Sequence, residues 1–291
     1  MIAEVIIEDA LAHINSCERD PTNLSDTWKQ TLRERMNLLS VDSLRTMRSP
    51  GSPASASIVD SSYMIDSSVL NERAAELLAR VQEPGFGAPL RDMPVNGQSI
   101  SSLFARDLNT AAWIIDHIGP VNGPIRILEV GGGTGILQFI LKSFFGDMCS
   151  IFSVDIPETL VLQECLLRVS FPDAPWCYKH NTQPITAQTG GLHFINADVV
   201  TSQDLCFDVA VNIDSMQEMS AEQVDRYLTY ISANLAPRGV LFLQNHYGHP
   251  QGAHAEPSEF ALAALVPTSC RVAWQLETCS SSEQLRLVCR R

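Results

Sequence analysis

Basic residues are scarce in this chain of 291 residues, which has 20 Lys and Arg against 33 Asp and Glu and a net charge of −13. The scarcity argues against a nucleic-acid clamp, which needs Lys and Arg to neutralise phosphates. It argues equally against binding to an anionic membrane surface. No apolar run approaches the roughly 18–20 residues that a membrane-spanning helix needs. We therefore expect neither nucleic acid nor a membrane as a partner.

Signals for export and for paired cysteines are missing as well. The first ten residues, MIAEVIIEDA, have no basic start and no cleavage-site pattern, so a secretory signal is not expected. None of the eight cysteines forms a C-x-x-C pair. We expect reduced, mostly buried thiols and a cytoplasmic protein. The hydrophobic fraction of 45% is ordinary for a globular protein with a large core.

The first 120 residues favour helices separated by irregular segments. Apolar residues recur at helical spacing in three segments, around 28–39, 70–82 and 100–118. Residues 49–62 are rich in Pro, Gly and Ser and predict a flexible connection, whereas 82–97 are rich in turn signals. We expect residues 1–120 to form an N-terminal helical cap, folded over one edge of the following domain, with 82–97 in its lid.

From residue 121 to 291, short apolar runs alternate with helical patterns, which indicates a mostly parallel sheet covered by helices on both faces. Seven runs are strand candidates: 125–130, 150–155, 192–196, 207–212, 240–245, 271–277 and 284–290. Helices are expected over 136–145, over 157–170 and from a Ser220–Gln223 capping box to Leu235. Residues 171–190 resemble a loop. The prediction is an α/β fold with a seven-stranded, doubly wound, Rossmann-like sheet.

The most informative stretch is a glycine-rich turn between the first strand and the first helix of this domain. It follows Glu129 and Val130 and places glycines at 131, 132, 133 and 135. Glycines let the backbone bend sharply and approach a ligand, and the next helix offers free N–H groups. Neither G-x-G-x-x-G nor G-x-x-x-x-G-K-[S/T] occurs here, so a dinucleotide site and a phosphate loop are disfavoured.

The pattern E-x-G-x-G-x-G resembles the first motif of class I methyltransferases that use S-adenosyl-L-methionine (SAM). In that family a carboxylate ending the second strand binds both ribose hydroxyls, and Asp155 holds that position. An Asp after the third strand often meets the adenine amino group, and Asp198 fits. The resemblance implies a SAM-binding domain, S-adenosylhomocysteine as the product, and these cofactor-binding residues: Glu129, Gly131, Gly132, Gly133, Gly135, Asp155, Ile156, Asp198 and Asn212.

The segment after the fourth strand carries a second resemblance. Asn212 begins N-x-x-S-M-Q-E-M, which lacks the prolines of the [D/N]-P-P-[Y/F] motif of amino-group methyltransferases. Together with 85–89 and 155–160, this block is similar to a family of sugar O-methyltransferases over roughly residues 82–250. The resemblance implies transfer of a methyl group to a hydroxyl of a sugar or a glycosylated metabolite. A non-sugar acceptor and a non-catalytic subunit of the same fold remain alternatives.

Methyl transfer to a hydroxyl calls for a base. The candidates are Asp214 and Glu218 after the fourth strand and His246 after the fifth. His246 is the preferred base because imidazole titrates near neutral pH, with Glu218 or Asp214 orienting it or holding the sugar. Each also has a structural interpretation: helix cap for Glu218, acceptor of loop amides for Asp214, packed edge residue for His246. A Mg²⁺ held by all three is a further alternative, but the spacing shows no metal signature.

Overall fold

The computed structural model describes residues 2–16, 64–82, 95–96, 99–216, 219–246, 271–279 and 282–290. The helix expected around 28–39, the connection 49–62 and most of the expected lid 82–97 lie outside these ranges. Among the described helices, none has the length and the apolar character needed to cross a membrane.

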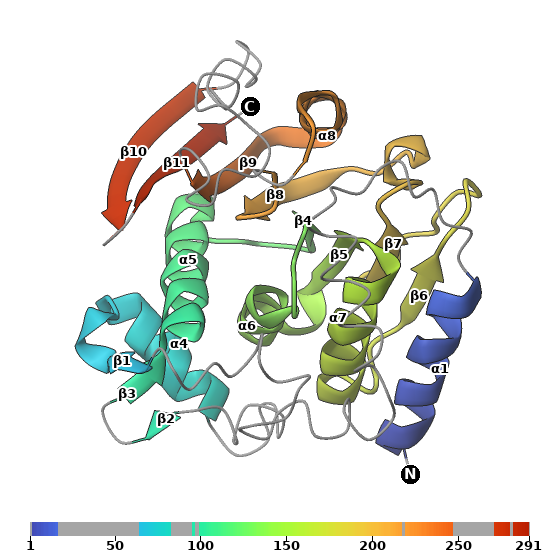
Figure 1. Ribbon diagram of the computed structural model, residues 1–291, viewed down its shortest axis with the longest axis horizontal. Coiled ribbons are helices and arrows are strands. Elements are labelled where there is room, and N and C mark those ends of the chain that lie inside the picture. Colours follow the sequence, from blue (N-terminus) through green and yellow to red (C-terminus); the bar gives the residue numbers. More distant parts are fainter. Residues whose placement is uncertain are drawn as a thin grey trace.

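A sheet of eight strands forms the centre of the molecule, in the order β10-β11-β9-β8-β4-β5-β7-β6 (Figure 1). Six of these strands are parallel, and each pairs in parallel with its neighbour within this group: β4 (Ile125–Val130), β5 (Cys149–Asp155), β6 (Trp176–Lys179), β7 (Leu192–Asn196), β8 (Phe207–Ile213) and β9 (Leu235–His246). The antiparallel strands β10 (Arg271–Cys279) and β11 (Ser282–Arg290) complete the sheet, and β11 pairs with β9.

All seven expected strands are present, but the expected number was one too small. The additional strand is β6, within the segment 171–190 that resembled a loop; it pairs in parallel with β7 from Trp176 onward. Its four residues are too few to show an alternating pattern. Strand β9 also begins five residues earlier than expected, at Leu235, because an irregular pairing between β8 and β9 accommodates Arg238 at φ 69°.

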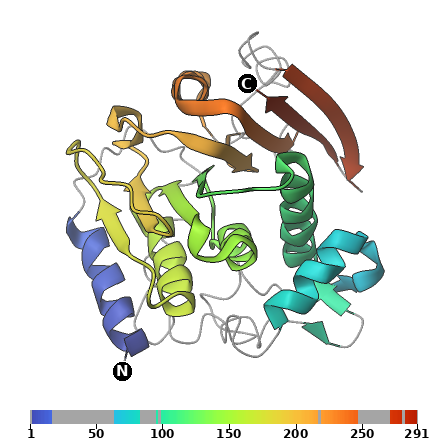
Figure 2. The same ribbon diagram turned by 180° about the vertical axis from the view of Figure 1, so that it is seen from behind.

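Two apolar cores lie on opposite faces of the sheet, and alternate strand residues enter each of them. Ile127 and Ile151 belong to the core that also contains side chains of five helices, α1 (Ile2–Ser16), α4 (Glu72–Gln82), α5 (Ser102–Ile118), α6 (Ile136–Phe145) and α7 (Pro157–Ser170). Leu128 and Phe152 belong to the other core, which is covered by α8 (Ala221–Asn234) (Figure 2). The expected Ser220–Gln223 capping box begins α8. The described residues also include the short 3₁₀ helices η4 (Ser67–Val69), η6 (Gly146–Met148) and η7 (Val200–Ser202).

The N-terminal region is not purely helical, which corrects the expectation of a helical cap. Strands β1 (Met64–Asp66), β2 (Val95–Asn96) and β3 (Ser99–Ser101) form a small antiparallel sheet. Helix α5 packs on the face of the large sheet, where the ring centroids of Trp113 and Phe242 are 5.0 Å apart. In the described part, α1, α5, α6 and α7 therefore form one layer beside the sheet (Figure 1). The boundary at residue 120 remains a prediction.

The order of the strands indicates where a ligand would be expected to bind. From β4 the chain moves outward through β5 and then returns to β8 on the other side of β4. In doubly wound sheets, ligands bind outside the carboxyl ends of the strands at such a switch point. The glycine-rich turn after β4 and the segment after β8 both lie there.

Candidate functional site

The first glycine of the turn lies against the segment that follows β8. Gly131 has φ +73°, and its N–H donates to the carbonyl of Val154 at 2.8 Å. A Cβ at this position would lie 2.0 Å from Oγ of Ser215. Because no side chain fits between them, a glycine is required where the two segments meet.

The other glycines of the turn differ in what surrounds them. Gly135, at φ +86°, precedes α6, and a Cβ there would lie 3.3 Å from Cα of Gln163. A Cβ at Gly132 would lie 2.4 Å from the Gln138 side chain. At Gly133, with φ +57°, a Cβ would meet nothing within 4 Å. This glycine therefore borders open space, while the other three are enclosed.

Asp155 connects the end of β5 to the glycine turn. Its Oδ1 accepts the N–H of Ile156 at 2.8 Å, and its Oδ2 accepts the N–H of Gly133 at 3.3 Å. The Gln163 side chain donates to the same Oδ2 at 2.8 Å and to the carbonyl of Gly133 at 3.1 Å. These donors fix the carboxylate beside the turn. Ile156 is the N-cap residue of α7, and Pro157 follows at its first position, as expected.

Glu129 is a buried carboxyl group directly behind the turn. Only 3% of its surface is exposed, and its Oε2 has no hydrogen-bond partner among the described residues. A Cβ on Gly132 would lie 2.9 Å from this oxygen. Burial, together with the charges of Asp107 and Asp155, raises the pKa of Glu129 to about 8. The carboxyl group is thus mostly protonated at neutral pH.

Helix α5 brings an arginine and an aspartate to the site. Nη1 of Arg106 lies 2.8 Å from Oδ2 of Asp214, and its Nε and Nη2 each lie 3.0 Å from Oδ1 of Asp107. Burial opposes the charged guanidinium, but the carboxylates of Asp107 and Asp214 outweigh it and raise the pKa of Arg106. Sequence reasoning missed both α5 residues. The available signal was an adjacent pair of opposite charges between Phe104 and Leu108, on a helix otherwise treated as core.

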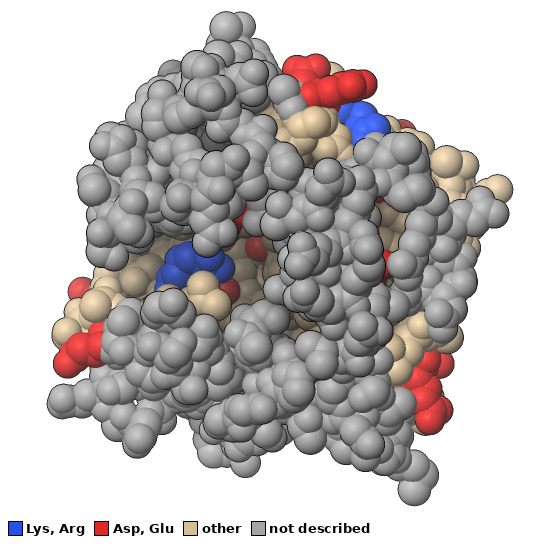
Figure 3. All heavy atoms as spheres, in the orientation of Figure 1, with Lys and Arg blue, Asp and Glu red and all other residues tan. Residues whose placement is uncertain are grey.

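The site as a whole has a surplus of negative charge. Four carboxyl groups, those of Asp107, Glu129, Asp155 and Asp214, interact with one another or with the guanidinium of Arg106. Figure 3 shows a hollow over the region of α5 with basic and acidic atoms side by side in its floor. Such a site favours neutral or positively charged ligands over anions.

Two expected cofactor ligands occupy different environments. Asn212 is fully buried, and its side-chain NH₂ donates to the carbonyl of Val130 at 2.9 Å. Its side-chain oxygen accepts from Asn245 at 3.0 Å and from the N–H of Met216 at 3.3 Å. Asn212 therefore connects β4, β9 and the segment after β8. Asp198 is exposed just beyond the end of β7.

Of the three catalytic candidates, Asp214 is the one whose side chain the structure describes. Asp214 has φ 56°, and its N–H donates to the carbonyl of Gln244 in β9 at 2.8 Å. His246 is the last residue of that strand and pairs in register with Gln284. The His246 side chain and Glu218 lie outside the described residues. No set of three or more His, Cys, Asp or Glu in the described part is arranged to hold a metal ion.

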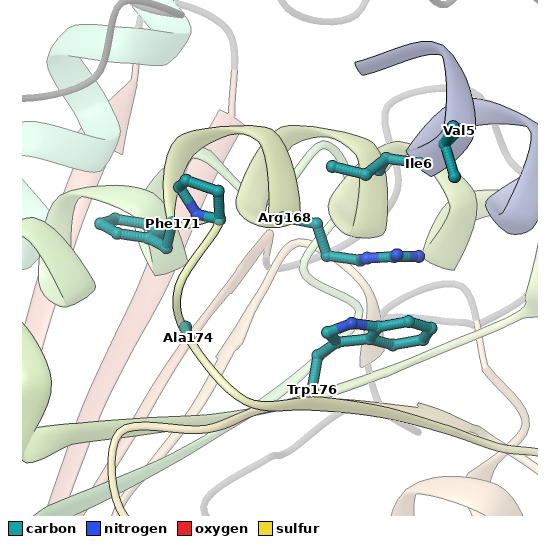
Figure 4. A pocket seen from close by; sticks show the side chains of 7 residues that line it. Val5, Ile6, Arg168, Phe171, Ala174 and Trp176 are labelled. Atoms are coloured by element: carbon teal, nitrogen blue, oxygen red, sulfur yellow. The ribbon is translucent and has the colours of Figure 1, made fainter. Parts of the chain in front are cut away.

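A pocket of about 390 Å³ lies elsewhere, between α1 and the far edge of the sheet (Figure 4). Its lining includes Val5 and Ile6 from α1, and Arg168 and Phe171 at the end of α7. The Cζ of Arg168 lies 3.4 Å from the ring centroid of Trp176, which begins β6. Trp176 thus lies beside α1, at the amino end of the parallel strands and away from the glycine turn.

Comparisons with known proteins give structural similarity only. No protein-family model matches the sequence, and no curated protein matches it. Among solved structures, phosphoethanolamine N-methyltransferase 2 from Haemonchus contortus, in complex with SAM, is 14% identical with a TM-score of 0.42, covering 63% of this chain and 52% of that one. TrmN from Thermus thermophilus is 12% identical with a TM-score of 0.47, covering 68% and 55%. The N-methyltransferase NodS from Bradyrhizobium japonicum, in complex with S-adenosylhomocysteine, is 12% identical with a TM-score of 0.44, covering 76% and 99%. This chain thus spans about half the length of the first two proteins.

Proposed function

We propose that this chain is a SAM-dependent O-methyltransferase whose acceptor is a hydroxyl group of a sugar or a glycosylated metabolite. The observation that carries the proposal is the glycine turn at the switch point of the sheet, with the carboxyl groups of Glu129 and Asp155 against it. In this proposal, residues 121–291 bind the cofactor, and residues 1–120 contribute Arg106 and Asp107 to the site.

The chemistry of SAM fits these residues. SAM carries an ammonium and a sulfonium group, and a site with surplus carboxylates favours both. The buried Oε2 of Glu129, which has no partner among the described residues, is an acceptor that an ammonium N–H would satisfy. Asp155 offers two acceptor oxygens for neighbouring ribose hydroxyls. Asp198 would meet the adenine, while Gly131, Gly132, Gly135, Ile156 and Asn212 would shape the turn around the cofactor.

When bound, SAM supplies an activated methyl group. The displacement is in line, so the protein has to hold the acceptor oxygen in place and remove its proton. We assign Asp214 a positioning role, because its carboxylate is already paired with Arg106 at 2.8 Å. His246, at the end of the neighbouring strand, is the proposed base, and Glu218 is proposed to hold the sugar. The negative surplus disfavours anionic acceptors, which is compatible with a neutral sugar as the acceptor.

Calorimetric titration with S-adenosylhomocysteine tests the cofactor. We expect one site per chain with micromolar affinity. Asp155→Ala should weaken binding at least about tenfold, because charge-assisted hydrogen bonds to two hydroxyls are lost. Asp208→Asn is the matched control, since Asp208 pairs with Arg126 at the other ends of β8 and β4. Absence of binding to the wild-type protein would overturn the proposal and favour a non-catalytic subunit.

Transfer of radiolabelled methyl groups from SAM tests the acceptor. A panel of neutral sugars, non-sugar hydroxyl compounds and amines should be labelled in the sugars alone. Labelling of the non-sugar hydroxyl compounds would show that the acceptor is a different metabolite and not a sugar. Label in the amines would contradict O-methylation and leave the cofactor assignment intact.

A further inference from the structure

We infer that this site exchanges a proton for a cation: Asp107 and Glu129 hold a proton in the free protein, and it leaves to solvent when the ammonium group of the cofactor or its product binds. This inference rests on the proposed function. The proton exchange does not follow from the glycine motif, because it depends on Arg106 and Asp107, which belong to α5.

The buried carboxyl groups of the site outnumber its basic groups, so a further positive charge is needed to balance them. Asp107 and Glu129 are 7% and 3% exposed, so neither carboxylate can be stabilised fully by water. The Arg106 guanidinium donates hydrogen bonds to Asp107 and Asp214. One positive charge therefore faces two carboxylates that it contacts directly and a third, Glu129, behind the turn. A proton on the buried pair reduces this negative surplus at the lowest cost.

The position of Glu129 links this proton to the ligand. Its Oε2 has no hydrogen-bond partner among the described residues and lies where a Cβ on Gly132 would come within 2.9 Å. The carboxyl group is thus in contact with the turn at which a ligand is expected. An ammonium N–H that donates to Oε2 would supply the missing positive charge, and the carboxyl proton would then be released to the buffer.

Burial and the neighbouring carboxylates favour the protonated form of Asp107 and Glu129. Burial raises the pKa of Glu129 to about 8 and raises that of Asp107 as well. Asp155 at the end of β5 adds negative charge, whereas Arg106 and a hydrogen bond from Gln138 on α6 oppose the shift in part. Asp214, after β8, raises the pKa of Asp107 further. At pH 7 most of the Glu129 carboxyl groups would therefore carry the proton.

Calorimetry in buffers of different ionisation enthalpy measures the exchange. S-adenosylhomocysteine is titrated into the full-length protein at pH 7 in phosphate, imidazole and Tris, because its own ammonium group is fully charged at that pH. The slope of the observed enthalpy against the buffer ionisation enthalpy should correspond to release of roughly 0.5–1 proton per bound ligand. Affinity should rise by up to about tenfold from pH 6 to pH 7, since each released proton contributes that factor.

Variants assign the proton to the cluster. Glu129→Gln keeps the shape of the protonated carboxyl group and should abolish both the buffer dependence and the rise in affinity. Asp208→Asn, at the other ends of the same strands, should behave as the wild type does. If the wild-type protein binds the ligand with no buffer dependence, the proton exchange is overturned, while the proposed function stands. This wild-type measurement tests the inference even if Glu129→Gln fails to fold. A slope that Glu129→Gln leaves unchanged also overturns it. Absence of binding in every buffer overturns the proposed function as well.

Discussion

Two glycines in the turn after β4 have the same kind of backbone and different neighbours. Gly131 and Gly133 both have positive φ, but a Cβ would meet Ser215 Oγ at 2.0 Å in the first case and nothing within 4 Å in the second. The first glycine is therefore needed for packing. The second leaves room beside the turn, where a ligand is proposed.

Alanine at each of the two positions separates these roles. Gly131→Ala should lower the free energy of unfolding by at least about 2 kcal/mol, because the clash adds to the strain of a left-handed residue. Gly133→Ala should cost about 1 kcal/mol, from strain alone, and should weaken S-adenosylhomocysteine binding at least tenfold. Urea unfolding and calorimetry measure the two effects. Equal loss of stability in both variants would contradict the assignment.

The proposed base makes a prediction about turnover. His246→Ala should lower kcat by about 10²–10⁴-fold, the usual contribution of a general base. S-adenosylhomocysteine affinity should stay within about twofold of the wild-type value. The measurement needs an acceptor from the labelling panel. A drop of less than tenfold would transfer the role of base to Glu218.

Helix α1 contacts α7 through polar groups that include the buried Arg168 and also His13, whose Nδ1 lies 2.9 Å from Oε2 of Glu164. Arg168 donates to Oε1 of Glu164 at 2.5 Å and to Oδ2 of Asp9 on α1 at 3.1 Å, and it stacks on Trp176. Glu164 has a fully buried side chain. Without the guanidinium, this carboxylate would lose a positive partner in a region of low dielectric constant.

Arg168→Ala should therefore lower the free energy of unfolding by about 3 kcal/mol, the usual cost of leaving one partner of a buried ion pair. The matched control is Arg73→Ala, whose ion pairs with Glu76 and Asp116 are exposed and whose removal should leave the urea midpoint unchanged. Similar midpoints for the two variants would show that the Arg168 cluster does not hold α1.

Sequence reasoning succeeded where a pattern is long or chemically distinctive. It predicted α6, α7, the capping box of α8 and seven strands, because apolar periodicity and turn residues are local properties. It missed β6, since Trp176 to Lys179 form a strand only by pairing with β7. It placed the glycine turn and Asp155 at one edge but missed Arg106. A contact between residues 106 and 214 depends on how α5 packs on the sheet, which periodicity does not specify.

At the scale of the whole molecule, two buried groups give stability a predictable dependence on pH. The folded pKa of Glu129 is raised to about 8 from 4.5, so the folded state binds more protons between these values and stability falls as pH rises. Burial lowers the pKa of His193 to about 4 from 6.5, so the unfolded state binds more protons there and stability rises with pH. The two effects oppose each other between pH 4.5 and 6.5.

Above pH 6.5 the effect of His193 is complete, whereas the raised pKa values of Glu129 and of its neighbour Asp107 still make stability fall as pH rises. The free energy of unfolding should then fall between pH 6.5 and 8, with Glu129 contributing about 1.4 kcal/mol per pH unit at most. Glu129→Gln should remove the contribution of Glu129 to this decline, and urea unfolding at four pH values measures it. A parallel decline in the variant would assign the dependence to another group.

The pairing of β11 with β9 has a consequence for how the chain is made. The segment of β9 from Val240 to His246 pairs with β11, whose residues follow much later in the sequence. During synthesis the long strand β9 therefore emerges with one side unpaired, a backbone that other chains can add to. A nascent chain that stalls before residue 282 would expose this edge, and we expect it to be retained by chaperones until the last strand is released.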